Sequence, residues 1–312
     1  MIGNNKMTLA PIVLFVYNRP WHTKKTIESL QKNELASESK LYIYSNEAKN
    51  EDERKSVDEV RAYVESISGF KKIIIIKREK NWGLANSIID GVTKVINEYG
   101  KIIVLEDDLI TSPYFLKFMN DALEFYQDRK DIFSITGFSF SEKFMNFPKG
   151  YSEDIYLNIR PMSWSWASWN DRWDGIDWEV KNFHSFVTDK NKVKAFNAGG
   201  TDLSRMLTLQ MQGKLDSWYI RWSYHAFLKK QLTIYPRMSF VNNLGFDHSG
   251  VHSGYDKQNI YSHSELNFDS DFRFAKQIQV NNRIVNNFNK SFNIKLKTEV
   301  KVLIKRIMRL WQ

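Results

Sequence analysis

The stretch Lys101-Ile-Ile-Val-Leu-Glu-Asp-Asp-Leu109 decides how this chain folds. Its apolar residues run without interruption to Leu105, which is typical of a strand buried on both faces in the middle of a sheet. Three carboxylates follow at once. Because like charges a few ångströms apart repel and raise each other's pKa, we expect a cation or a bound proton beside Glu106, Asp107 and Asp108.

The position of these acids predicts a ligand. In an open α/β sheet, ligands bind in the crevice beyond the carboxyl ends of the strands, so the acids indicate a metal-bridged ligand that carries phosphate. In a second interpretation they only favour the dipole of a helix that Ser112 caps and Pro113 opens. Three acids in succession favour the ligand.

Strands and helices alternate on either side of this stretch. Apolar runs predict strands at 11–17, 41–45 and 72–77 before it and at 132–136 after it; helical periodicity predicts helices at 20–30, 51–67, 85–99 and 113–126. This order predicts an α/β fold with a mostly parallel, Rossmann-like sheet flanked by helices. Arg19 and Asn46 directly follow the first two strands, so they lie at the crevice edge. Arg19 suits either a phosphate contact or a surface loop.

The composition changes after Gly137. Residues 160–173 contain four Trp, which suit either a hydrophobic core or a wall on which a sugar ring stacks. Helices are expected at 191–196, 201–212 and 216–229, with Asp216 as a possible N-cap of the last, and strands at 231–235 and 238–241. The polar loop 242–254 carries His248 and His252, which suit the closure of a metal or phosphate site, or simple solvation.

The charge of the chain points to an anionic partner. The 312 residues carry a net charge of +9, with a pI near 9.3, and include no Cys, so disulfides and thiolate metal sites are excluded. No signal peptide and no apolar stretch of about 18 residues is recognised, so we expect a cytoplasmic protein. Nucleic-acid modules and phosphate-binding loops are also missing, and no nucleic-acid partner is expected.

The residues 294–312 form the pattern of a basic amphipathic helix. Lys and Arg side chains surround a regularly spaced set of apolar residues. Such a helix suits the surface of an anionic bilayer, or packing on the domain or on a partner chain. We favour the bilayer, which predicts peripheral binding at the inner face of the cell membrane.

These features, in this order, resemble a bacterial GT-A glycosyltransferase of the family 2 type. The resemblance rests on Asn18-Arg19-Pro20, Asn81-Trp-Gly-Leu-Ala85, Glu106-Asp-Asp-Leu109, the Trp-rich block and the Gly/His loop, and it covers about residues 8 to 255. Around the acids the chain is also similar to the animal N-acetylglucosaminyltransferase I family. One departure is Ser165, where the family's Trp block usually carries a Gly.

The resemblance implies roles for individual residues. Asp108 would bind a divalent metal, Mn²⁺ or Mg²⁺, that bridges the donor diphosphate, with His252 rather than His248 closing on it. Asp216 would be the catalytic base. The donor, of which a UDP-sugar is the first choice, would contact the remaining candidates: Arg19, Asn46, Asn81, Gly83, Asn86, Glu106, Asp107, Trp164 and Trp166.

The same resemblance predicts the organisation and the reaction. A catalytic domain 1–255 would comprise a nucleotide-sugar half, 1–137, and an acceptor half, 138–255, followed by an extension, 256–312. The expected reaction is inverting transfer of a sugar to a glycan or polyprenyl-linked saccharide in surface polysaccharide synthesis. Two alternatives stay open: a nucleotidyltransferase, which would need a Gly-rich phosphate loop that 16–20 does not supply, and a non-enzymatic carbohydrate-binding or membrane-adaptor protein.

Overall fold

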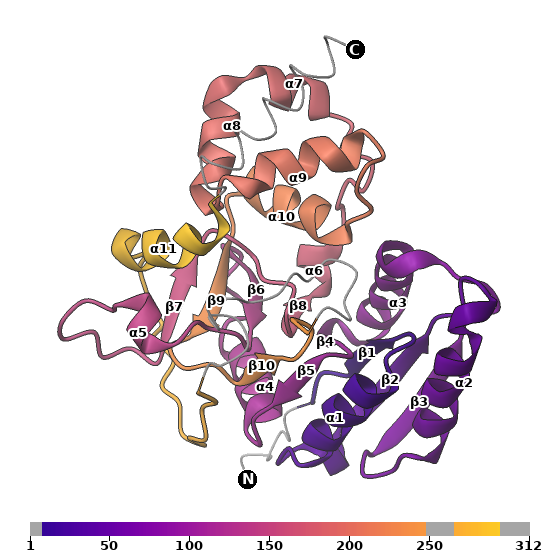
Figure 1. Ribbon diagram of the computed structural model, residues 1–312. Helices are drawn as coiled ribbons and strands as arrows, with labels where there is room; N and C mark the ends of the chain where they lie inside the picture. Colours follow the sequence, from indigo (N-terminus) through magenta and orange to yellow (C-terminus); the bar gives the residue numbers. More distant parts are fainter. Residues whose placement is uncertain (1–7, 248–264, 294–312) are drawn as a thin grey trace, which may run out of the picture.

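The computed structural model describes residues 8–247 and 265–293 (Figure 1). Its main sheet has eight strands in the order β3-β2-β1-β4-β8-β6-β9-β7, and helices cover its faces. In the described part of the chain a second, two-stranded sheet pairs β10 with β5 in antiparallel register. The predicted α/β class, with a mostly parallel sheet flanked by helices, is confirmed.

The first four strands of the main sheet are parallel neighbours. Their bounds are β1 Ile12–Val16, β2 Lys40–Ser45, β3 Lys72–Lys77 and β4 Lys101–Glu106. Val16 of β1 lies opposite Ser45 of β2, and Phe15 lies opposite Glu106 of β4. The carboxyl ends of β1, β2 and β4 therefore meet at one edge of the sheet, where the acids were expected.

Side chains of β1 enter two cores, one on each face of the sheet, because successive residues of a strand point to opposite sides. Ile12 and Leu14 lie in the larger core, which includes apolar residues of α1 and α4. Val13 and Phe15 lie in the second core, which includes apolar residues of α3 and α10. A strand that is apolar on both faces thus becomes the centre of the fold.

The second half of the sheet mixes directions. Its strands are β6 Ile132–Thr136, β7 Ile155–Asn158, β8 Trp166–Trp169 and β9 Leu232–Pro236. The strand β8 lies between β4 and β6 and is antiparallel to both; β9 is parallel to β6 and antiparallel to β7. The Trp-rich block therefore supplies a central strand, which the sequence did not predict.

Four longer helices lie close to their predicted positions: α1 Pro20–Gln31, α2 Glu51–Ser66, α3 Gly83–Tyr99 and α4 Phe115–Phe125. The remaining described helices are α5 Glu142–Met145, α6 Asn170–Trp173, α7 Phe183–Thr188, α8 Lys190–Phe196, α9 Asp202–Met211, α10 Trp218–Leu228 and α11 Asn282–Asn289. Three 3₁₀ turns complete them, η1 Ala36–Glu38, η2 Asn197–Gly199 and η3 Lys290–Phe292.

Several local expectations are wrong. The acids do not open a helix, because the short strand β5 Leu109–Thr111 follows them and the N-cap of α4 is Tyr114 rather than Ser112. The strand expected at 238–241 begins only at Val241, as β10 Val241–Asn243. The N-cap of α10 is Ser217, whose hydroxyl accepts from the Ile220 N–H, so Asp216 has no capping role.

The described segment 265–293 packs onto the main body of the molecule. Ile284 and Phe288 of α11 are fully buried in the larger core.

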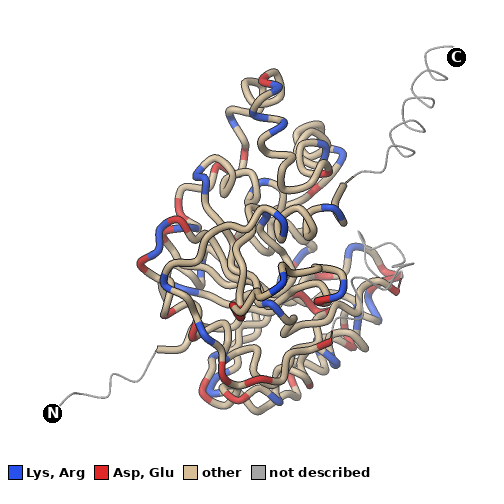
Figure 2. Tube along the Cα trace, turned by 90° about the vertical axis from the view of Figure 1, so that its left-hand side faces the viewer, with Lys and Arg blue, Asp and Glu red and all other residues tan. Residues whose placement is uncertain are grey.

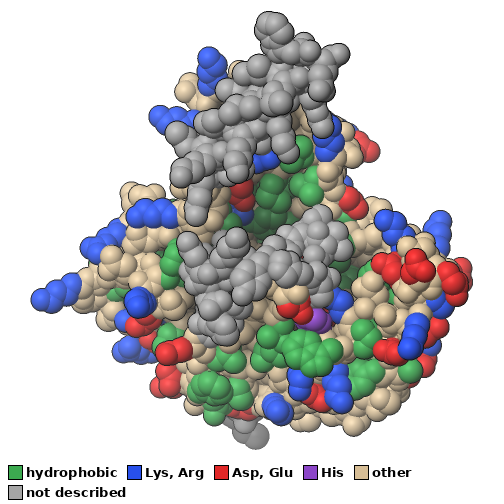
Figure 3. Space-filling view, in the orientation of Figure 1, with side chains coloured by type: hydrophobic (Ala, Val, Ile, Leu, Met, Phe, Trp, Pro, Cys, Tyr) green, Lys and Arg blue, Asp and Glu red, His purple; other side chains and the backbone are tan. Residues whose placement is uncertain are grey.

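Acidic and basic residues are interspersed along the chain (Figure 2). In Figure 3, hydrophobic side chains gather on the visible surface where Figure 1 places α9 and α10. None of the helices in the described parts has the length and hydropathy needed to cross a bilayer.

Candidate functional site

The acids lie in a turn between β4 and β5 that α1 fixes in place. The Thr26 hydroxyl on α1 donates to the Asp107 carbonyl oxygen at 2.8 Å and accepts from the Leu109 N–H at 3.1 Å. Thr26 is fully buried, so no water competes for these bonds. The sequence offered no signal for this role, because the two partners lie more than 80 residues away.

Arg19 supplies the positive charge that was expected beside the acids. Its guanidinium forms ion pairs with Asp107 and with Asp108, and its Nη2 lies 3.0 Å from Asp108 Oδ2. Burial acts to lower the pKa of Arg19, but the charges of Asp107 and Asp108 outweigh it and raise the pKa above its ordinary value. Arg19 therefore stays charged and is no simple surface residue.

Glu106 provides the expected proton. Burial, followed by the negative charge of Asp108, raises the pKa of Glu106 to about 8. Burial raises the pKa of Asp107 as well, although the charge of Arg19 opposes this shift. The coupled carboxyl groups of the turn therefore hold protons more readily than ordinary acids do, and a further cation beside them would favour their charged forms.

A second turn closes against Asp108. The Leu244 N–H donates to the Asp108 carbonyl oxygen at 2.8 Å, and the Asn243 side-chain oxygen accepts from the Gly245 N–H at 2.7 Å. A Cβ at Gly245 would meet the carboxylate of Asp108, so a side chain there would force that carboxylate to shift. Gly245 thus lets the second turn lie close against Asp108, a contact that the Gly/His loop alone did not reveal.

His22 joins α1 to the end of this second turn. Its Nε2 lies 3.0 Å from Asp247 Oδ2, and the His22 side chain is only 7% exposed. The predicted closing residue His252 and its alternative His248 follow Asp247 in the chain and lie outside the described residues. Their roles stay predictions.

Asn46 connects the end of β2 to the loop that precedes α3. Its side-chain oxygen accepts from the Trp82 N–H at 3.0 Å, and the Asn81 amide donates to the Glu47 carbonyl oxygen at 2.6 Å. The Asn81 oxygen in turn accepts from the Gly83 N–H at 2.9 Å. These candidates are brought together, but their amides are used to shape the loop.

Arg78, which lies against Trp82 in the loop before α3, is a residue that the sequence analysis missed. It follows β3 as Arg19 follows β1, which was the available signal. Its guanidinium lies 4.1 Å from the centre of the Trp82 ring and 5.0 Å from that of Tyr44, and it pairs with Asp90 at 2.5 Å.

Asn86 lies on the outer side of this loop. Its amide donates to the Trp82 carbonyl oxygen at 3.1 Å. Asn81, Trp82 and Asn86 line a groove of about 750 Å³ together with residues of α3. The candidates Asn81 and Asn86 therefore share one surface.

Asp216, which lies just before α10, approaches the same loop. A side chain built on Gly83 would place its Cβ 3.4 Å from Asp216 Oδ2. The Asp216 side chain is 63% exposed, and its Oδ1 lies 3.8 Å from a guanidinium nitrogen of Arg221. An exposed carboxylate beside the candidate donor loop is free to meet a second substrate.

Trp164 and Trp166, the two Trp candidates for donor binding, differ in burial. Trp166 is fully buried and packs against Trp173, Trp218 and Trp222, so the core interpretation holds for it and stacking on a sugar does not fit. The Trp164 ring packs against Phe138 at 4.7 Å between centroids and is only partly buried.

The turn partly fits a divalent metal. Within residues 8–247 and 265–293, no group of three or more His, Cys, Asp or Glu side chains is arranged to hold an ion. Asp107 Oδ2 and Arg19 Nη1 are nevertheless buried without a hydrogen-bond partner among the described residues. Hard oxygens suit Mn²⁺ or Mg²⁺, which are commonly bound by one or two carboxylates plus substrate phosphates. A metal held here by Asp108 would take its other ligands from a phosphate-bearing substrate.

Comparisons with known proteins identify one family. The model of glycosyl transferase family 2 matches residues 12–185, more than half of the chain. No curated protein matches the chain in sequence.

Solved structures resemble the chain only distantly. The fragment 1–349 of S. aureus TarS in complex with UDP-GlcNAc is 12% identical, with a TM-score of 0.42, and the match covers 75% of this chain and 58% of that one. PcManGT from Pyrobaculum calidifontis, a mannosyltransferase in complex with GDP-Man and Mn²⁺, is 9% identical, with a TM-score of 0.34 and coverages of 54% and 49%. Mouse xyloside xylosyltransferase 1 is 9% identical, with a TM-score of 0.37 and coverages of 72% and 82%. The chain thus spans less than two thirds of the TarS fragment.

Proposed function

This chain belongs to glycosyl transferase family 2, and we propose that it moves a sugar from a nucleotide-sugar donor to a hydroxyl group of a glycan or polyprenyl-linked saccharide. Surface polysaccharide synthesis in a bacterium is the setting that the resemblance favours. The observation that carries the proposal is the acidic turn at the carboxyl end of β4, with Arg19 paired to two of its acids. Its position at the strand ends is where an open α/β sheet binds ligands.

The donor would bind along the carboxyl ends of β1, β2 and β4. Arg19, with one nitrogen unpaired, is suited to a diphosphate oxygen, and the loop of Asn81 and Gly83 to the nucleoside side. A UDP-sugar is the first donor to test. Asp107 and Asp108 orient Arg19, and Asp108 would hold a divalent metal together with His252.

The metal, when bound, neutralises charge on the departing diphosphate. Arg19 adds a fixed positive charge on the same side, close to the acids that hold it. This pairing limits the movement of the guanidinium, so little reorganisation is needed as the negative charge develops.

Asp216 is proposed as the base. It accepts the proton of the acceptor hydroxyl while that oxygen forms a bond to the anomeric carbon and the bond from this carbon to the diphosphate breaks. Attack from the face opposite the leaving group inverts the configuration. The exposure of Asp216 beside Gly83 supports this assignment, because the base must meet the acceptor next to the donor.

A thermal-shift panel tests the proposal first. UDP, GDP, CMP and dTDP sugars are added with and without Mn²⁺; a ligand bound only by the folded state raises Tm. We expect one nucleotide to raise Tm, and more so with Mn²⁺. Asp108→Ala should lose the Mn²⁺-dependent part, and Asp58→Asn, an exposed acid on α2, should behave as the parent. No shift with any nucleotide would contradict the proposal and favour the carbohydrate-binding alternative.

Asp216→Asn separates binding from chemistry. The release of nucleoside diphosphate from the donor should fall at least about a hundredfold, the ordinary size of a general-base contribution, while the nucleotide-induced Tm shift stays. Loss of the Tm shift would remove Asp216 from the base role.

The segment 294–312 is proposed to bind the inner face of the membrane. Its Lys and Arg residues would be attracted to anionic lipid, by about 1 kcal/mol each near the surface. Deletion of 294–312 should abolish sedimentation with anionic vesicles and leave the nucleotide-induced Tm shift unchanged. A truncated chain that still sediments would refute the membrane role.

A further inference from the structure

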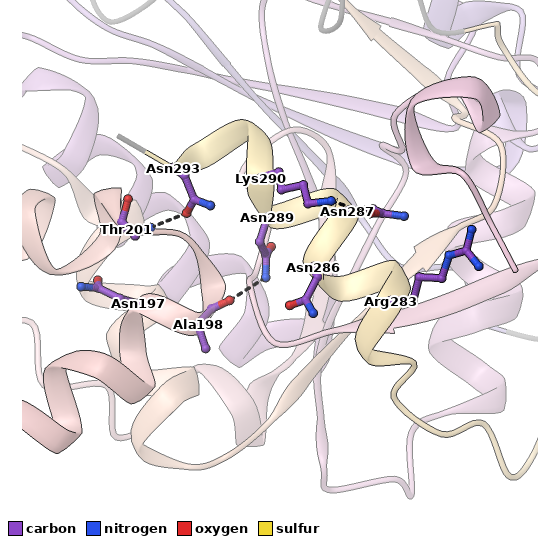
Figure 4. A pocket seen from close by; sticks show the side chains of 9 residues that line it. All are labelled: Asn197, Ala198, Thr201, Arg283, Asn286, Asn287, Asn289, Lys290 and Asn293. Carbon is purple, nitrogen blue, oxygen red and sulfur yellow. Dashed lines mark hydrogen bonds between the residues drawn. The ribbon is translucent and has the colours of Figure 1, made fainter. Parts of the chain in front are cut away.

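A polar groove lies between α11 and the residues that precede α9 (Figure 4). Its volume is about 730 Å³, which is in the range of small-molecule sites. The described residues that line it are Asn197, Ala198, Thr201, Arg283, Asn286, Asn287, Asn289, Lys290 and Asn293.

The lining has an unusual chemistry. Five of these nine residues are asparagines and two are cations, while no described lining residue is acidic or aromatic. An asparagine amide both donates and accepts hydrogen bonds, as a sugar hydroxyl does. Two cations without a carboxylate beside them give the groove a positive potential.

Part of the lining holds the groove together. The Asn289 amide donates to the Ala198 carbonyl oxygen at 2.9 Å, and the Asn293 side-chain oxygen accepts from the Thr201 N–H at 3.1 Å. Both bonds join α11 and its continuation to the other wall, as Figure 4 shows. These asparagines are explained by structure alone.

Arg283 and Asn286 are not explained in this way. Neither the guanidinium of Arg283 nor the amide of Asn286 has a hydrogen bond or ion pair with any residue that the structure describes, and both side chains are exposed. Arg283 lies one turn before Asn286 on α11, and both residues line the same groove.

The lining discriminates between classes of ligand. A nucleobase is disfavoured because the described lining offers no aromatic ring for stacking. An apolar peptide finds only Ala198, and a nucleic acid would need more than two cations. A saccharide with many hydroxyl groups and a few negative charges fits each of these features.

We propose that this groove binds a negatively charged portion of a saccharide, with Arg283 and Lys290 contacting the acidic group and Asn286 a hydroxyl. That this saccharide is the acceptor rests on the proposed function. The groove adjoins α11, which packs against β7, and β7 lies four places from β4 in the sheet. At about 4.8 Å per strand this is roughly 20 Å, so the bound portion is remote from the reacting hydroxyl.

Saturation-transfer NMR with the full chain tests the proposal. The probes are a galacturonate trisaccharide and the neutral galactose trisaccharide of the same linkage. We expect the acidic probe to bind more tightly than the neutral one, and Arg283→Gln to weaken only the acidic probe, by about three- to tenfold. Asn286→Ala should weaken both probes.

Matched controls come from the same region. Arg205→Gln removes an exposed cation of α9 outside the groove, and Asn282→Ala removes an exposed amide of α11 outside it; both should bind as the parent does. If Arg205→Gln and Arg283→Gln lose equal affinity for the acidic probe, the attraction is a general charge effect and the proposal is overturned. The proposal is also overturned if the two probes bind equally well, or if neither probe binds. Displacement of the acidic probe by an equal concentration of inorganic phosphate would also overturn it, because a plain anion site needs no saccharide.

The two proposals can fail separately. Arg283→Gln should leave the nucleotide-induced Tm shift unchanged, since Arg283 is remote from the acidic turn. If the saccharide binds but no nucleotide raises Tm, only the transferase proposal is refuted. If a nucleotide raises Tm but the saccharide does not bind, only the proposed role of the groove is refuted.

Discussion

Ser165 occupies a backbone conformation that suits glycine. Its φ is 49°, in the left-handed region, and its buried hydroxyl has no hydrogen-bond partner among the described residues. The resemblance expects a glycine at this position. The local cost arises because a Cβ in this region crowds the following carbonyl oxygen.

We expect Ser165→Gly to stabilise the protein by about 1 kcal/mol. Relief of backbone strain and removal of an unpaired hydroxyl together exceed the entropy that glycine adds to the unfolded chain. Denaturant unfolding at constant m-value measures the change. Ser165→Ala removes only the hydroxyl and keeps the backbone strain, so comparing it with Ser165→Gly separates the two contributions to the free energy of unfolding. A less stable Ser165→Gly protein would show that the strain interpretation is wrong.

At the scale of single residues, the sequence revealed the members of the site but not their contacts. The acids and Arg19 were placed at one edge of the sheet because both follow apolar strands. The ion pair between them spans 88 residues, and nothing local in the sequence indicates which partner an arginine takes. Gly245 shows the same limit, because its need for space appears only once Asp108 lies against it.

The longer and more regular a helix or strand is, the more readily the sequence predicted it. The strands β1 and β4 are continuous apolar runs with mostly buried side chains, and β2 and β3 carry partly buried apolar residues nearer the sheet edge. The helices α1 to α4 have clear periodicity. Three short strands, β5, β7 and β8, have three or four residues each, too few for a period-2 pattern to stand out. In β8 the tertiary pairing with β4 and β6 overrides a composition that favours no element.

The helix α10 carries a buried histidine whose protonation opposes folding. Burial, followed by the positive charge of Lys229, lowers the pKa of His225 to about 4, and its ring lies 6.2 Å from that of Phe133 between centroids. In the unfolded chain the pKa is ordinary, near 6.5, so between these values the unfolded state binds more protons. Stability is therefore lost as the pH falls from about 6.5 toward 4.

We expect this histidine to contribute up to about 3 kcal/mol to that loss. In His225→Gln the free energy of unfolding should fall less between pH 7 and pH 4.5, when both proteins are measured in denaturant. The exposed His184 has no such environment, and His184→Gln should follow the parent. Parallel curves for His225→Gln and the parent would mean that other groups govern the acid sensitivity.

On the scale of the whole molecule, Arg160 joins three parts. It follows β7, binds both carboxylate oxygens of Asp202 at the start of α9 at 2.8 and 2.9 Å, and stacks on Phe292 of η3 at 3.8 Å from the ring centre. Arg160 itself is only 3% exposed. One side chain thus links the sheet edge, the helices α7–α10 and the last described segment.

We expect Asp202→Ala to destabilise the protein by about 3 kcal/mol, because it leaves the Arg160 charge buried and unpaired. The double variant Arg160→Met with Asp202→Leu should recover most of this loss, since it removes both charges. Chemical denaturation measures both. Glu28→Ala, which breaks exposed pairs on α1, should stay within about 0.5 kcal/mol of the parent. A similarly small effect of Asp202→Ala would show that Arg160 finds solvent or another partner.

The insertion of β8 between β4 and β6 also has a consequence for how the chain folds while it is being synthesised. The strands β3, β2, β1 and β4 can assemble as soon as residue 106 has left the ribosome, but the outer edge of β4 receives its partner only when β8 has been made. At roughly 5–20 residues per second, several seconds pass in which that edge offers unpaired backbone groups to other nascent chains. Synthesis of the Trp-rich block ends this exposure, because the backbone of β8 then pairs with β4 while its Trp side chains fill the core.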